Sequence, residues 1–215
     1  MKNQKVAVIG LGNIGQAVAA NLSKSDRTFI VADRNSAKAD KLASDWGTLV
    51  EVNTIVNAVK NAGVLVLAIP FQEISAFMAQ YASDLESKII VDPSNAIAPD
   101  ENGGFKKIIG PDESAGEINS KALPKNTQLV KALGTLGADS LANGAYQMPG
   151  QAVLFYANDD TTANPIIEKI IADMGFDALR IGGINQSSRI EVFGDLHEFG
   201  ALGKTVTLAE ARLKV

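Results

Sequence analysis

A glycine turn set between a short apolar strand and a helix constrains this chain most. Residues 6–33 read VAVIGLGNIGQAVAANLSKSDRTFIVAD, with Gly10, Gly12 and Gly15 in the spacing Gly-x-Gly-x-x-Gly. The run 6–9 is typical of a parallel strand that is buried on both faces. Asp33 ends a second apolar strand about 20 residues further on. Strand, turn, helix, strand and acid in this order predict a dinucleotide-binding unit.

Each residue of the turn has its own physical reason. Gly10 lets the chain turn sharply out of the strand, Gly12 lets a pyrophosphate approach the backbone, and Gly15 lets the helix pack closely. The helix that begins near Asn13 directs unpaired N–H groups and its positive dipole end at the phosphates. Asp33 is placed to accept a hydrogen bond from a ribose hydroxyl. We therefore expect the cofactor-binding residues of this segment to be Gly10, Leu11, Gly12, Asn13, Ile14, Gly15, Asp33 and Arg34.

The rest of the chain alternates between strand and helix patterns. We expect strands at 28–31, 49–52, 64–69, 88–91, 128–132, 153–156 and 177–181. We expect helices at about 13–22, 35–46, 53–62, 72–81, 113–123 and 163–174, and a terminal helix from Gln186 that is broken near Gly194 and Gly200. The stretches 97–114 and 134–150 have the Gly and Pro content of loops. This order predicts an α/β fold of the Rossmann type: a doubly wound, mostly parallel sheet with helices on both faces and a small C-terminal extension.

We expect residues 1–150 to form the dinucleotide-binding domain and residues 151–215 to form an α/β extension packed on it as one compact unit. Two predicted strands end in polar or proline-containing segments, Ile69-Pro70-Phe71 and Ser94-Asn95. Because ligands bind outside the carboxyl ends of parallel strands, Ile69, Pro70, Phe71 and Asn95 are further candidate cofactor contacts.

Composition excludes several classes of protein. The net charge of −4 and the absence of a basic stripe argue against nucleic acid or an anionic membrane as partner. With no cysteine, the chain has no disulfide, thiol nucleophile or thiolate metal site. Because the first predicted strand begins almost at the N-terminus and no apolar stretch reaches about 18 residues, we expect a cytoplasmic protein.

Five blocks along the chain carry a family likeness: GLGNIGQAVAANL, VLAIPFQE, KALGTLGADSLANG, YANDD and GGINQSSRIE. In this order they resemble the deazaflavin (factor 420)-dependent NADP oxidoreductases and the related dinucleotide-binding oxidoreductases. The resemblance implies hydride transfer between a nicotinamide and a second ring system, with no catalytic acid or base and no metal. It also implies that Gly134 and Thr135, in the loop 133–136, face the nicotinamide.

The chain departs from this family at two places. It has Gly134 where the deazaflavin enzymes have histidine and Gly137 where they have proline, so a flavin, a deazaflavin or a quinone-like molecule stays open as acceptor. The pair Asp33-Arg34 leaves the dinucleotide open as well. A carboxylate favours NAD through the ribose 2′-hydroxyl, whereas a guanidinium favours the 2′-phosphate of NADP. The resemblance tips the expectation slightly to NADP.

Few other side chains suggest chemistry. We interpret His197, the only histidine, as a solvated or packing residue, and Asp159-Asp160 as helix-capping acids and not a metal site. Arg189 fits a functional role and a structural ion pair equally well.

Three functions compete at this stage. The favoured one is an NAD(P)H-dependent oxidoreductase with a small planar acceptor. The second is a redox-sensing or regulatory module that binds the dinucleotide without turnover. A β-hydroxyacid or imine dehydrogenase is disfavoured because those enzymes add a large helical domain, and only residues 151–215 remain here. A single Rossmann domain leaves the nicotinamide open to water, so we expect a homodimer or a higher homo-oligomer.

Overall fold

The structure, a computed structural model, describes residues 4–215. Its strands are β1 (Val6–Ile9), β2 (Phe29–Ala32), β3 (Val50–Val52), β4 (Val64–Leu67), β5 (Ile89–Asp92), β6 (Ile97–Pro99), β7 (Phe105–Lys107), β8 (Gln128–Ala132), β9 (Val153–Ala157) and β10 (Asp177–Gly182). Its α-helices are α1 (Asn13–Leu22), α2 (Ser36–Trp46), α3 (Ile55–Asn61), α4 (Phe71–Gln80), α5 (Ala82–Leu85), α6 (Ala115–Ser120), α7 (Ala138–Asn143), α8 (Asn164–Asp173), α9 (Ser187–Ile190) and α10 (Leu208–Ala211).

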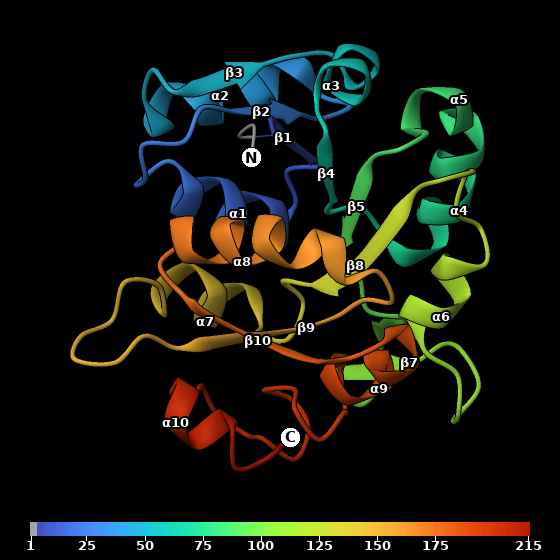
Figure 1. Ribbon diagram of the computed structural model, residues 1–215, viewed down its shortest axis with the longest axis vertical. Coiled ribbons are helices and arrows are strands. Elements are labelled where there is room, and N and C mark those ends of the chain that lie inside the picture. The colour runs from blue at the N-terminus through green and yellow to red at the C-terminus, as the bar shows by residue number, and fades with distance from the viewer. Residues whose placement is uncertain (1–3) are drawn as a thin grey trace.

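Eight strands form one sheet in the order β10-β9-β8-β5-β4-β1-β2-β3, which runs from bottom to top in Figure 1. The six strands from β8 to β3 are parallel. The strand β9 pairs with β8 antiparallel and with β10 parallel. The predicted Rossmann-type, mostly parallel sheet is therefore confirmed. Beyond β8, the strands β9 and β10 run in the opposite direction to the other six.

Alternate residues of the strands face two separate cores, as expected for a sheet covered on both faces. Val6 and Val8 of β1 join a core with α1, α2, α7 and α8, in which α1 and α8 lie side by side (Figure 1). Ala7 and Ile9 join a core with α3, α4 and α5. A third cluster holds the chain after β10 against β9. The carboxyl ends of the parallel strands are thereby left free to carry a site.

Three local expectations were wrong. The stretch 97–114 contains the antiparallel hairpin of β6 and β7. The Gly-rich stretch 134–150 contains α7. The segment from Gln186, expected as a helix broken near Gly194 and Gly200, is α-helical only in the four-residue α9 and α10 and otherwise forms turns. A smaller difference concerns the helix expected at about 53–62: α3 begins at Ile55 because Thr54 is its N-cap, with the Thr54 hydroxyl accepting from the Asn57 N–H at 3.2 Å. The remaining boundaries lie within a few residues of those expected.

Candidate functional site

The glycine turn leaves open space at the N-terminus of α1. Gly10 has a φ of 88°, in the region that favours glycine, and a Cβ on Gly15 would overlap the Gly10 carbonyl oxygen. A Cβ on Gly12, by contrast, would meet no atom within 4 Å, and Gly12 is exposed. No side chain caps the N-terminus of α1. The fold thus requires Gly10 and Gly15, whereas Gly12 borders a space that the protein itself does not fill.

The end of β2 carries Asp33, whose carboxylate is already engaged by the backbone. Its Oδ2 accepts from the Leu11 N–H at 2.7 Å and its Oδ1 accepts from the Asn35 N–H at 2.9 Å. Asp33 therefore ties the glycine turn to the start of α2. Arg34 is exposed, and Lys38 lies nearby in the first turn of α2.

Two cavities adjoin at this turn. The first, of about 560 Å³, lies between the turn, the ends of β2 and β4, and α4; its lining includes Gly10, Leu11, Gly12, Asp33, Arg34, Lys38, Ile69, Pro70, Glu73 and Phe77. The second, of about 390 Å³, extends from Gly12 past the end of β5 to the C-terminal segment; its lining includes Asn13, Ile14, Phe71, Asn95, Phe105, Leu136, Val192, His197 and Phe199. Both are bordered by Gly12, Ala68, Ile69 and Pro70, so one elongated ligand can occupy both.

The loop after β8 forms one wall of the second cavity, but part of it is buried. Leu136 and Gly137 line the cavity, whereas Gly134 and Thr135 are buried behind it. A Cβ on Gly134 would overlap the Pro93 carbonyl oxygen. These two backbones approach so closely that a side chain at position 134, such as the histidine implied by the resemblance, would require them to shift.

The single histidine, His197, holds this loop through a hydrogen bond to its backbone. His197 is 1% exposed; its Nε2–H donates to the Gly134 carbonyl at 2.9 Å, and its Nδ1 accepts from the Phe199 N–H at 2.8 Å. Burial lowers the pKa of His197 to about 4, against the opposing effects of Gly134 and Glu198, so the ring is neutral near pH 7. The interpretation as a packing residue fits this geometry, although the ring also touches the cavity.

Glu198 holds the start of α7 from a distant part of the chain. Its Oε2 accepts from the Gly137 N–H at 2.7 Å, and its Oε1 accepts from the Ser140 hydroxyl. The Glu198 N–H donates to the Thr135 carbonyl at 3.1 Å. His197 and Glu198 together therefore fix the loop 134–140, which walls the second cavity.

Asn95 joins three segments beside this loop. Its Nδ2 donates to the Gly134 carbonyl at 3.1 Å, and its Oδ1 accepts from the Val192 N–H at 2.7 Å. Asn95 lines the cavity as expected of a site residue, but both ends of its amide are used by the protein.

A buried cluster of charged side chains joins the ends of β5 and β8 to Glu191 and the start of α6. The Lys131 ammonium lies 3.1 Å from Asp92 Oδ2 and 3.6 Å from Glu191 Oε1, and it donates to the Ser94 carbonyl. The Glu191 carboxylate accepts from the backbone N–H groups of Ala115 and Gly116 at the start of α6. Two carboxylates thus share one lysine and a helix N-terminus, which offsets the cost of burying them.

Most of the expected cofactor residues meet at the two cavities, and some do not line them. Gly10, Leu11, Gly12, Asn13, Ile14, Asp33, Arg34, Ile69, Pro70, Phe71 and Asn95 line one cavity or both. Gly15, Gly134 and Thr135 lie behind the walls. The sequence interpretation missed Lys38, Phe77, Phe105, Val192 and Phe199. In the sequence, these residues are marked only by their apolar or charged character, and no motif spacing connects them with a site.

Other candidate residues have structural partners. Arg189 pairs with Asp195 at 2.8 Å and donates to the Lys214 carbonyl, which favours the ion-pair reading. Asp160 accepts from the Thr162 N–H at the start of a short 3-10 helix, as a capping acid does. Within residues 4–215, no group of three or more His, Asp or Glu side chains is arranged to hold a metal ion. No helix in that range is long and apolar enough to cross a membrane.

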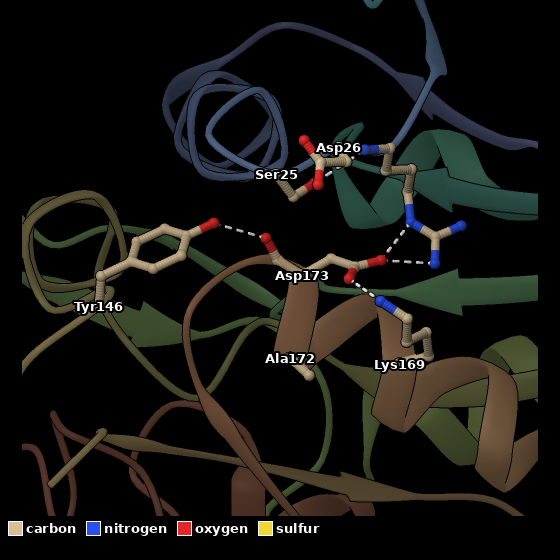
Figure 2. Close-up of a pocket in the computed structure, with 7 residues that line it drawn as sticks. Ser25, Asp26, Tyr146, Lys169, Ala172 and Asp173 are labelled. Atoms are coloured by element: carbon tan, nitrogen blue, oxygen red, sulfur yellow. Dashed lines mark hydrogen bonds and ion pairs between the residues drawn. The ribbon is translucent and has the colours of Figure 1, made fainter.

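A third cavity lies near the C-terminal end of α1, away from the glycine turn, and its lining residues bond to one another. Figure 2 shows Tyr146 donating to the carbonyl of Asp173, at 2.6 Å, and the Asp173 carboxylate pairing with Lys169. Arg27 also pairs with this carboxylate at 2.6 Å. These contacts join the end of α8 to the chain before β2, one helix length of about 15 Å from the glycine turn.

The fold and the cavities define the class: an α/β protein of the Rossmann type with an open crevice at the carboxyl ends of its strands. Residues 5–96 match the family model described as NADP oxidoreductase coenzyme F420-dependent. The expected resemblance is thereby confirmed over the part of the chain that carries the glycine turn, Asp33-Arg34 and Asn95.

Three individual comparisons agree with this class. A ketol-acid reductoisomerase (NADP(+)) from Pyrobaculum aerophilum is 33% identical over 93 residues, which are 43% of this chain and 28% of that protein. A hypothetical protein from Sinorhizobium meliloti is 27% identical, with a TM-score of 0.82 and 95% of each chain covered. A protein from an Arthrobacter species, assigned as an F420-dependent NADP reductase, shares the fold at 22% identity, with a TM-score of 0.70 and coverage of 86% of this chain and 87% of that one. The named relatives are NAD(P)-dependent oxidoreductases, consistent with the class expected from the sequence.

Proposed function

We propose that this protein is an NAD(P)H-dependent oxidoreductase that transfers hydride between a nicotinamide and a small planar acceptor. The observation that carries the proposal is the pair of cavities that meet at Gly12. A Cβ there would stand in open space, beside a helix N-terminus that no side chain caps.

The dinucleotide fits this arrangement with its pyrophosphate at Gly12 and at the first turn of α1. The adenosine half lies in the first cavity, along Ile69, Pro70 and Phe77. The nicotinamide half lies in the second cavity, between the end of β5 and the wall formed by Leu136. Gly134 and Thr135 act from behind this wall by setting its position.

The charges at the end of β2 favour NADP over NAD. Asp33 uses both carboxylate oxygens to accept backbone N–H groups, which offsets its charge toward a nearby phosphate. Arg34 and Lys38 both line the first cavity, and a guanidinium pairs bidentately with phosphate. Arg34 and Lys38 follow Asp33 closely in the chain and suit a 2′-phosphate at the end of β2, whereas Glu73, the other carboxylate of this cavity, comes from α4.

The second cavity suits an acceptor that needs no proton from a side chain. A nicotinamide held there would supply a hydride to the acceptor and solvent would supply the remaining proton, so that NADPH, H⁺ and acceptor would give NADP⁺ and reduced acceptor. Both nitrogens of His197 and both ends of the Asn95 amide are engaged by the protein. The contribution of these residues is to hold the walls of the cavity in position.

Steady-state oxidation of NADPH and NADH, followed by the absorbance of the reduced nicotinamide, tests the proposal with a panel of flavin and quinone acceptors. We expect turnover with at least one acceptor, and a higher kcat/KM for NADPH than for NADH. Tight NADPH binding without turnover on any acceptor would instead support a redox-sensing or regulatory module.

We also propose that the protein acts as a homodimer or a higher homo-oligomer. Phe105 and Phe199 at the mouth of the second cavity are each 50% exposed, which leaves the nicotinamide end open to water in one copy. Light scattering during gel filtration measures the mass directly, and a fully active monomer would reject this part of the proposal.

A further inference from the structure

The second cavity differs from the first in charge. The first cavity is lined by Asp33, Arg34, Lys38 and Glu73, whereas the lining of the second includes no Asp, Glu, Lys or Arg. Its one titratable group is His197, whose pKa burial lowers to about 4. Apart from the backbone N–H groups at the N-terminus of α1, which the pyrophosphate would occupy, these walls carry no group that would repay an anion for the water it loses on entering.

Two polar side chains of the second cavity are already engaged within the protein. The amide of Asn95 and the ring of His197 each make two hydrogen bonds to the backbone. The Ser94 hydroxyl oxygen is buried without a partner among residues 4–215, and as an uncharged group it offers a ligand no compensating charge.

The hairpin of β6 and β7 contributes the ring of Phe105 to the second cavity but neither of its two lysines. Phe105 lines the cavity, and because successive strand residues point to opposite faces, Lys106 points away from that side. Lys107 shares the face of Phe105, but its ammonium donates to the carbonyls of Pro111 and Glu113 at 2.8 and 2.6 Å.

A second aromatic ring, Phe199, comes from the C-terminal segment and is held in place. Its ring lies 5.5 Å from that of His197, and it packs where a Cβ on Gly137 would otherwise stand. Phe105 and Phe199 therefore present half-exposed rings to the same cavity from two distant parts of the chain.

We propose that the hydride acceptor is an uncharged aromatic ring system without an anionic tail, bound in the second cavity against Phe105 and Phe199. This inference rests on the proposed function, because it names the acceptor class of the same site. The phosphates of a dinucleotide bound at Gly12 would add negative charge beside the cavity and strengthen the discrimination against an anion.

Riboflavin and FMN test the inference as a matched pair, because they share one ring system and differ by a phosphate. With saturating NADPH, we expect kcat/KM for riboflavin to exceed that for FMN by about tenfold or more, a factor that corresponds to about 1.4 kcal/mol. Equal or better use of FMN would overturn the inference and leave the proposed function standing. Reduction of neither flavin, nor of an uncharged quinone such as menadione, would overturn both.

Variants of Phe105 and Phe199 test whether the acceptor binds against these two rings. Phe105→Ala and Phe199→Ala should each lower kcat/KM for riboflavin several-fold while leaving the Kd of NADPH within twofold. Phe193→Ala is the control, since Phe193 is 52% exposed and does not line the cavity. If the control variant lost as much activity as the other two, the acceptor would not lie against Phe105 and Phe199.

Discussion

Protonation of His197 should destabilise the protein and loosen the wall of the second cavity. The ring is 1% exposed, its Nδ1 accepts from the Phe199 N–H, and burial lowers its pKa from 6.5 to about 4. Between these two values the unfolded chain binds more protons at this group than the folded chain does. Stability conferred by the neutral ring is therefore complete above about pH 6.5, is lost as the pH falls toward 4, and changes no further below that.

The size of the effect follows from the shift. A difference of one pKa unit is about 1.4 kcal/mol, so this shift of about 2.5 units makes the loss roughly 3 kcal/mol of unfolding free energy. Urea unfolding of the wild type and His197→Gln at several pH values isolates it, because glutamine keeps a donor for the Gly134 carbonyl and does not titrate. We expect the two curves of stability against pH to converge by about 3 kcal/mol between pH 6.5 and 4. Parallel curves would refute the assignment of a buried neutral histidine.

Three further substitutions test other parts of the structure. Gly134→Ala places a Cβ against the Pro93 carbonyl, so it should lower stability by about 2 kcal/mol in urea unfolding, and an unchanged midpoint would contradict the packing. Arg34→Ala should weaken NADPH about tenfold and NADH little in fluorescence titrations, whereas an equal loss for both would argue against a 2′-phosphate contact. Lys88→Met removes donors to the carbonyls of Val59, Lys60 and Ala62 at the end of α3; it should cost about 1 kcal/mol in unfolding experiments, and no loss would mean that water satisfies those carbonyls equally well.

The N-terminal half of the fold could be predicted because its signals are local. The strand β1, the glycine turn and α1 follow one another within residues 6–22, and β-branched runs mark the buried parallel strands. By contrast, α7 was missed because the side chain that holds its start, Glu198, lies 61 residues further along the chain from Gly137. The strands β6 and β7 have three residues each, too few for an alternating pattern to be recognised.

The candidate site was predicted unevenly for the same reason. Its dinucleotide half is built from the turn, Asp33-Arg34 and the strand exits, which carry motif spacing. Its acceptor half depends on Phe105, Val192 and Phe199, which tertiary packing brings to one cavity from separate segments. The division of the chain at residues 150 and 151 stays a prediction, and β9 and β10 continue the main sheet.

Binding of NADPH at Gly12 is the central claim, and the Kd of Gly12→Val measures it most directly. The new side chain meets no protein atom at its Cβ, and loss of the glycine N-cap costs about 1 kcal/mol, so the variant should fold. Ala37→Val, at an exposed position of α2 that lines neither cavity, is the control for added bulk. Gly12→Val should weaken NADPH binding by roughly 100-fold in fluorescence titration, whereas the control should bind as the wild type does. Unchanged affinity in folded Gly12→Val would contradict it.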